Sequence, residues 1–351
     1  MPRETMTPRE RWLAVLNREK PDRIPMEYWA TPEATEKLLR HLNCDHDEML
    51  ERLHIDPMVG LGGRYVGPPI PENSDVFGIE RRRVEYGTGA YDESVSAPLG
   101  EYCSVEEIEA DYAWPKPDWW DYSHLQKEVE GKDHLPMRGG GSEPFLTYKA
   151  LRGEAQAFMD LIENPDIVHY CLDRLFELAY QNTLIIFEAI PGKVMVTFVA
   201  EDLGGQTSLM YSPQHIRDYL IPRMRQMVEL VKQHGSHVFH HSDGAVREIL
   251  PDLIEMGIEV LNPVQWRCPG MEREGLKRDF GDRLIFHGGV DNQYTIPFGT
   301  VEEVRSEVEE NIKTLGAGGG YIIAPCHNIQ AVGPPGNVVA LYETGYECGW
   351  Q

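Results

Sequence analysis

Short apolar segments alternate with helical patterns along most of this chain, and this alternation limits the possible fold more than any other feature. One predicted helix shows the helical pattern clearly, because its apolar residues Val301, Val304, Val308 and Ile312 recur every three or four positions. We predict eight strands, at residues 23–29, 56–60, 135–137, 193–199, 237–241, 258–261, 284–287 and 320–324. Strands that alternate with helices predict a parallel sheet, and eight of them favour a closed (β/α)8 TIM barrel over an open sheet.

Residues 65–134, approximately, interrupt this alternation. They are rich in prolines and tryptophans, and they contain a predicted hairpin through Ile79–Tyr86. Because the segment lacks the apolar periodicity of a domain, we predict one barrel domain over residues 1–351, with an irregular N-terminal insertion at about 65–134. After the insertion, Gly139–Phe145 is predicted to open the next helix.

Charge and cysteine usage narrow the possible partners and the compartment. The formal net charge of -24, from 57 acidic and 33 basic residues, argues against a nucleic-acid partner, whose phosphates such a protein repels. A neutral or cationic small molecule, or a protein with a basic face, is the easier partner. The six cysteines form no CxxC pair, the N-terminus shows no signal region, and no run reaches the roughly 18 apolar residues of a membrane span. We therefore expect a cytoplasmic protein with reduced thiols.

Polar side chains gather where the predicted strands end. In His237–Gly244, an apolar strand delivers His240, His241 and Asp243, and Gly244 leads into a helix. The carboxyl ends of barrel strands surround one axis, and enzymes of this fold keep their chemistry there. The ends of the other predicted strands supply Glu201, Asp202, Gln265, Asp291, Cys326 and His327.

Sulfur, nitrogen and oxygen donors at one barrel mouth are the ligands that Zn²⁺ binds, and a site with one open position would be catalytic. Two simpler interpretations stay open. A histidine and a carboxylate at strand ends often form a hydrogen-bonded pair that orients a loop. A single cysteine is often part of the core.

Eight short fragments connect the chain to a known family by their order and spacing. They are Pro21–Pro25, Gly141–Phe145, His241–Gly244, Asn262–Gln265, Phe280–Leu284, Gly288–Asp291, Ala324–Gln330 and Pro334–Val338. Together they resemble the uroporphyrinogen decarboxylase superfamily and, within it, the branch of corrinoid-dependent methyltransferases. The resemblance covers nearly the whole chain and implies a (β/α)8 barrel, in agreement with the number of predicted strands.

The resemblance implies one of two chemistries. Decarboxylases of the superfamily hold an acidic tetrapyrrole with arginines near the N-terminus, and Met26–Trp29 lacks such a segment here. The methyltransferases hold Zn²⁺ with a His-x-Cys motif and a later cysteine. His241 matches the motif histidine and Cys326 the later cysteine, whereas Asp243 stands where the motif has cysteine. The implied metal ligands are therefore His241, Asp243 and Cys326, with Glu201 as a further ligand or a supporting carboxylate, unless the metal has been lost.

The resemblance thus implies a zinc-dependent methyltransferase that moves a methyl group from a small donor to the Co(I) of a separate corrinoid protein. A methoxylated aromatic or a methylamine would be the donor, because a carboxylate in place of a thiolate makes zinc more Lewis-acidic toward oxygen and nitrogen leaving groups. The catalytic residues would be His241, Asp243, Asp291 and His327, and the substrate would contact Tyr28, Trp29, His240 and Gln265. Two alternatives remain, a metal-free lyase on another carboxylated substrate with Asp291 or His327 as acid and base, and a non-catalytic corrinoid-binding barrel.

Overall fold

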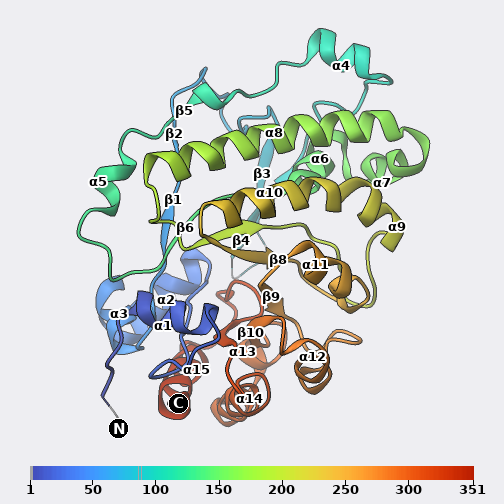
Figure 1. Ribbon diagram of the computed structural model, residues 1–351. Coiled ribbons are helices and arrows are strands. Elements are labelled where there is room, and N and C mark those ends of the chain that lie inside the picture. The colour runs from blue at the N-terminus through green and yellow to red at the C-terminus, as the bar shows by residue number, and fades with distance from the viewer. Residues whose placement is uncertain (1–2, 86, 88) are drawn as a thin grey trace.

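A curled sheet of seven parallel strands forms the centre of the computed structural model, which describes residues 3–85, 87 and 89–351 (Figure 1). The strand order is β1-β6-β7-β8-β9-β10-β11, so the strands of this sheet follow one another as they do in the sequence. Their bounds are β1 (Val59–Leu61), β6 (Met137–Ser142), β7 (Val196–Val199), β8 (His237–His241), β9 (Val260–Val264), β10 (Ile285–Val290) and β11 (Tyr321–Pro325). All seven therefore end at the same edge of the sheet.

The predicted first strand is present only as a bridge beside β11. Met26 pairs with Ile323 in parallel, and the N–H of Glu27 donates to the carbonyl of Ile323 at 2.9 Å. On its other side, the carbonyl of Met26 accepts from the N–H of Asp56 at 2.9 Å. Pro25 has no N–H to continue a ladder, which accounts for the short pairing.

The prediction that Gly139–Phe145 opens a helix is correct only at its end, because Gly139–Ser142 belong to β6 and helix α6 begins at Pro144. The glycines do not break the strand, since β1 and β7 pair with it on both sides. Gly141 has a φ of +124°, and a Cβ at this position would lie 2.2 Å from the carbonyl oxygen of Phe198. A larger residue would therefore force β6 away from β7 just before the pocket described below.

Helix α1 (Pro8–Leu16) closes the amino end of the sheet. Its Trp12, Val15 and Leu16 pack against the side chains with which the strands begin, among them Val196, Val260, Ile285 and Ile322. The buried guanidinium groups of Arg11 and Arg23 both bond to Asp56, which fixes the helix to the strand segments beside it. Because α1 fills the amino end of the sheet, a functional site is expected at the carboxyl end.

Helices cover the outer face of the sheet (Figure 1). No helix of the described residues is long and apolar enough to cross a membrane. The further helices are α2 (Pro32–Leu42), α3 (His46–Arg52), α4 (Val105–Asp111), α5 (Leu125–Val129), α6 (Pro144–Arg152), α7 (Glu154–Glu163), α8 (Pro165–Ala189), α9 (Pro213–His215), α10 (Ile221–Gln233), α11 (Leu250–Met256), α12 (Arg273–Phe280), α13 (Thr295–Phe298), α14 (Val301–Thr314) and α15 (Pro335–Cys348).

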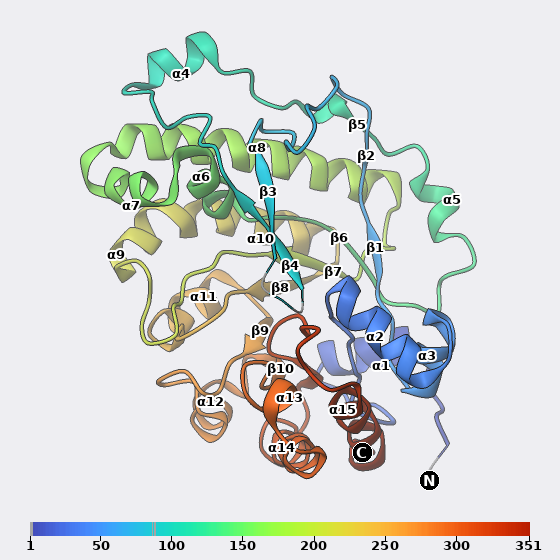
Figure 2. The ribbon, with the colours of Figure 1, turned by 180° about the vertical axis from the view of Figure 1, so that it is seen from behind.

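The segment between β1 and β6 carries two antiparallel strand pairs, β2 (Arg64–Tyr65) with β5 (Trp120–Asp121) and β3 (Arg81–Glu85) with β4 (Ala90–Ser94). The β3–β4 pair forms a hairpin where one was expected, although Tyr86 lies outside the described residues. The hairpin reaches the carboxyl edge of the sheet (Figure 2), where Gln330 donates to the hydroxyl of Tyr91 at 2.5 Å.

Candidate active site

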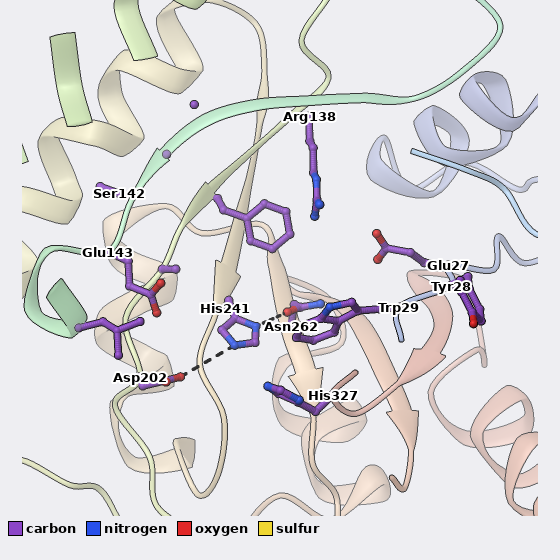
Figure 3. A pocket seen from close by; sticks show the side chains of 15 residues that line it. Glu27, Tyr28, Trp29, Arg138, Ser142, Glu143, Asp202, His241, Asn262 and His327 are labelled. Atoms are coloured by element: carbon purple, nitrogen blue, oxygen red, sulfur yellow. Dashed lines mark hydrogen bonds and ion pairs between the residues drawn. The ribbon is translucent and has the colours of Figure 1, made fainter. Parts of the chain in front are cut away.

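A cavity of about 590 Å³ opens at the carboxyl end of the sheet. Its walls come from the segment beside β11 and from β6, β7, β8 and β9 (Figure 3). The lining residues are Glu27, Tyr28, Trp29, Arg138, Gly140, Gly141, Ser142, Glu143, Leu146, Phe198, Ala200, Asp202, His241, Asn262 and His327. Its size and its mixture of aromatic and ionisable side chains are typical of a small-molecule site.

Three potential metal ligands meet at one side of this cavity. Asp202, His241 and Asp243 each offer one ligand atom, and these atoms all lie within 4.8 Å of one another. His241 is the last residue of β8, and its Nε2 lies 3.9 Å from Oδ1 of Asp202 (Figure 3). We call Asp202, His241 and Asp243 the trio.

Asp243 carries the observation that points most directly to a cation. Its Oδ1 is buried and has no hydrogen-bond partner among the described residues. Burial raises the pKa of this carboxyl, which is the cost of placing a negative charge away from water. A bound cation would offset that cost, so the residues present fit a metal ion.

Gly244 allows Asp243 to take this position. It has a φ of +81°, and a Cβ there would lie 2.3 Å from the carbonyl oxygen of Gly205. The turn is held by the side chain of Gln265, whose Oε1 accepts from the N–H of Gly244 at 2.6 Å. Gln265 therefore supports the turn and does not line the main cavity.

A chain of hydrogen bonds fixes the imidazole of His241 from behind. Nδ1 of His241 lies 2.6 Å from Oδ1 of Asn262, and Nδ2 of Asn262 lies 2.6 Å from Nδ1 of His287. Nε2 of His287 in turn lies 2.6 Å from Oε2 of Glu27. We call Glu27, His287 and Asn262 the relay.

The protons of the relay are assigned from the orientation of the Asn262 amide. Its oxygen accepts, so His241 donates from Nδ1; its nitrogen donates, so His287 accepts at Nδ1 and donates from Nε2 to Glu27. Burial raises the pKa of Glu27, but the hydrogen bond from His287, together with nearby charges, outweighs this effect and lowers the pKa, so the carboxylate is ready to accept. His241 is left with a lone pair on Nε2, on the side of the trio.

His327 and Trp29 form the wall of the cavity beside the trio. Nε2 of His327 lies 3.8 Å from Oδ2 of Asp243, and its ring centroid lies 4.5 Å from that of Trp29. The Trp29 ring is also edge-on to His241, at 6.0 Å. Tyr28 lines the same cavity, and its hydroxyl hydrogen-bonds with Thr35.

Glu143 completes the ionisable groups on the trio side. It stands directly before α6, and its carboxyl faces the cavity (Figure 3). Burial, with the nearby Asp202 carboxylate, raises its pKa to about 7. Glu143 can therefore hold a proton near neutral pH.

Two predicted metal ligands, Glu201 and Cys326, are not part of the trio. Oε1 of Glu201 accepts from the N–H of Phe145 at 2.8 Å in the interior, and burial raises its pKa well above the usual range. Side chains of neighbouring residues in an extended chain point in opposite directions. The side chain of Asp202 therefore lines the cavity, and that of Glu201 lies in the interior.

Cys326 is turned away from the cavity. Its thiol is buried and donates to the carbonyl of Val264 at 3.0 Å, and burial raises its pKa well above the usual range. Binding zinc would require the thiolate and the loss of this hydrogen bond. In this structure the ligand atoms that lie together with His241 come from Asp202 and Asp243, and Cys326 is not among them.

The remaining predicted residues, Asp291 and His240, lie outside the cavity. Oδ2 of Asp291 accepts from Nε of Arg267 at 2.7 Å and from the backbone of the following loop. His240 is fully buried, with Nδ1 2.7 Å from the carbonyl oxygen of Val199, and burial lowers its pKa to about 4. Both have structural contacts and neither reaches the substrate space.

The sequence reasoning did not select Glu27, Asn262 or His287. Glu27 and His287 lie within predicted strands, and Asn262 directly follows one. They could therefore have been found as polar residues within or next to predicted strands. Tyr28, Trp29, His240 and His241 were predicted site residues although they lie within predicted strands, so Glu27 and His287 met the same criterion.

We predict that Cys326→Ser leaves the metal content unchanged. A serine hydroxyl can donate to the same carbonyl, so the free energy of unfolding should change by less than about 1 kcal/mol. Metal analysis of the purified variant, with the exposed Cys103→Ser as control, checks this. If the Cys326→Ser protein were folded but contained no metal, the prediction would be wrong and the Cys326 thiol would be a metal ligand.

Comparison with known families explains the architecture around this cavity. Residues 122–348 match the family of uroporphyrinogen decarboxylase (URO-D). The chain belongs to the uroporphyrinogen decarboxylase family. Its URO-D region contains β6 to β11 and thus every residue of the trio.

The curated relatives of this URO-D family member are distant. Uroporphyrinogen decarboxylase of Legionella pneumophila (strain Philadelphia 1) is 24% identical over 238 residues, covering 65% of this chain and 63% of the relative. The enzyme of Neisseria meningitidis serogroup C is 25% identical over 223 residues, covering 61% and 55%. The chain thus spans less than two thirds of the length of these relatives.

Among solved structures, a methyltransferase from Methanosarcina mazei has a TM-score of 0.70 at 19% identity, covering 98% of this chain and 99% of that one. At this identity, the likeness shows that the two proteins share the fold over their full lengths.

Proposed function

We propose that this URO-D family protein is a zinc-dependent methyltransferase that moves a methyl group from a small donor to the Co(I) of a separate corrinoid protein. The observation that carries the proposal is the trio: one ligand atom of each of Asp202, His241 and Asp243 lies within 4.8 Å of the others, and Oδ1 of Asp243 is buried without a hydrogen-bond partner among the described residues. The fold shared with a methyltransferase is consistent with it. We also propose that the chain forms a closed eight-stranded barrel in one domain, with an irregular insertion at about 65–134. We further propose that the protein is cytoplasmic.

Zinc fits the trio because it accepts nitrogen and oxygen ligands and, in catalytic sites, commonly takes three from the protein. Bound there, it would act as a Lewis acid on the heteroatom of the donor. The relay would keep His241 in the tautomer that binds metal, and Trp29 with Phe198 would exclude water from one side of the donor.

The proposed methyl transfer is a nucleophilic displacement at the methyl carbon. The bond between the methyl carbon and the donor oxygen or nitrogen breaks, and its electron pair stays on that heteroatom. The Co(I) centre of the partner supplies the two electrons of the new bond to the methyl carbon. Glu143 or His327 gives a proton to the departing heteroatom, since both face the trio (Figure 3).

Zinc analysis together with a donor screen tests the proposal. After expression with added zinc, the protein should contain about one zinc per chain, and it should methylate Co(I) cobalamin from at least one methoxylated aromatic or methylamine. Less than about a tenth of an equivalent of zinc would contradict the proposed mechanism. Turnover that survives removal of zinc by a chelator would do the same.

A metal-free lyase is the second candidate, and the distant similarity to uroporphyrinogen decarboxylases favours it. A cavity with a single arginine suits one carboxylate rather than an acidic tetrapyrrole. Release of CO₂ from a monocarboxylate, unchanged by chelator and without any methyl transfer, would support this candidate. If a corrinoid co-purified with the protein and neither methyl transfer nor CO₂ release were observed, a non-catalytic corrinoid-binding barrel would be indicated.

A further inference from the structure

Arg138 is the cationic side chain of the cavity, and the mechanism above does not use it. It is the second residue of β6, and Figure 3 shows its side chain extending from the strand into the cavity. No other lysine or arginine lines this cavity in the part of the chain that the structure describes.

The guanidinium of Arg138, an exposed residue, contacts one aromatic ring and has free donors. Its central carbon lies 5.7 Å from the centroid of the Phe198 ring, a cation–π distance. Among the described residues it has no hydrogen bond within the protein and no ion pair. By contrast, Arg152 and Arg267 each bond to a carboxylate.

None of the acidic groups near Arg138 forms an ion pair with it in the part of the chain that the structure describes. Glu27 is within electrostatic reach, but its Oε2 already accepts from His287 at 2.6 Å. Asp202 belongs to the trio, and Glu143 stands beside the trio rather than beside Arg138 (Figure 3). The guanidinium of Arg138 thus keeps its donors available, with Glu27 as the one carboxylate within its electrostatic reach and the other carboxylates at the trio.

Apolar surfaces lie between these two sides. Phe198 carries Arg138 on its ring, and Trp29 packs near His241 and His327. Flat aromatic walls favour a flat apolar ligand, and a cavity of about 590 Å³ has room for one substituted ring.

We propose that Arg138 binds a carboxylate of the methyl donor, so that the donors are methoxylated aromatic acids with one carboxylate. The inference rests on the proposed function, since it names the donor class of the same site. The planar fork of arginine matches a carboxylate with two parallel hydrogen bonds. The ring of the donor would lie along Phe198, with its methoxy group toward the trio.

The arrangement also selects against other donors. A methylammonium ion has no acceptor for the Arg138 guanidinium, so it would leave the donors of that group unpaired. A substrate with several carboxylates would find one arginine and the three carboxylates of Glu27, Glu143 and Asp202. A single carboxylate at the Arg138 side avoids both conflicts.

Binding measurements test this inference without any turnover. Calorimetric titration of the zinc-loaded full chain with 4-methoxybenzoate and with the neutral 4-methoxybenzyl alcohol gives the affinity ratio of acid to alcohol. We expect the acid to bind about 10- to 100-fold more tightly, as charge-assisted hydrogen bonds predict. Arg138→Gln should bring the ratio close to 1, and Arg138→Lys should restore part of it because lysine keeps the charge but loses the fork.

The matched control is Arg174→Gln, which changes an exposed arginine on α8 outside the cavity and should keep the wild-type ratio. A wild-type ratio near 1, or a ratio that Arg138→Gln leaves unchanged, would overturn the inference. Tighter binding of 4-methoxyphenyl phosphate than of the benzoate would overturn the assignment to a carboxylate.

The outcomes keep this inference separate from the proposed function. If Arg138→Gln removes the preference for the acid while no donor is ever demethylated, the carboxylate site stands and the methyltransferase fails. If neutral methoxyarenes are demethylated as well as the acids, the methyltransferase stands and the role of Arg138 fails.

Discussion

Replacing His241 by alanine is expected to remove bound zinc and methyl transfer together. The imidazole is the one nitrogen ligand of the trio, and its Nε2 lone pair is oriented before metal arrives. Changing a group that only supports a ligand typically costs 10- to 100-fold in metal affinity, so losing the ligand itself should cost more than about 100-fold. Zinc content after dialysis and the rate of Co(I) methylation measure the two effects.

A matched control separates loss of the site from loss of the fold. His46→Ala removes a half-exposed imidazole on α3, away from the cavity, and should keep full zinc content and rate. His241→Ala should retain a thermal unfolding transition, because its side chain faces the cavity rather than the core. A folded His241→Ala protein with wild-type zinc content would rule out the trio as the metal site.

Replacing Asn262 by leucine is expected to weaken zinc binding by about 10- to 100-fold while every ligand stays in place. Leucine cannot accept from Nδ1 of His241, so the proton is no longer confined to that nitrogen and Nε2 loses its fixed lone pair. The nitrogen-15 shifts of the His241 ring should change from one tautomer to a mixture. A merely structural role of Asn262 would leave these shifts unaltered.

The conservative variant provides the comparison. Asn262→Asp keeps an oxygen that accepts from His241, so zinc affinity should remain within a few-fold of wild type. Asn262 is buried, and leucine also leaves Nδ1 of His287 without a donor, which should cost about 1–3 kcal/mol of stability. Equal zinc affinities for the leucine and aspartate variants would show that the relay does not act on His241.

Much of the fold could be predicted because its signals are local in the sequence. The apolar runs that became β7 to β11 are short and bounded by polar residues, so periodicity located them within a few positions. The β6 strand was misplaced because glycine normally ends a regular element, whereas here two neighbouring strands supply the hydrogen bonds around Gly139–Gly141.

The sequence by itself determined the alternation of strands and helices, membership in the URO-D family, and the delivery of His241 and Asp243 by one strand and its turn. These features depend on hydrophobic period and on residues adjacent in the chain. Only the tertiary structure decided that Asp202 and not Glu201 joins them, that Cys326 donates to a carbonyl instead, and that Arg138 stays free. Those outcomes depend on the direction of each side chain and on the register between strands distant in sequence, which no local pattern encodes.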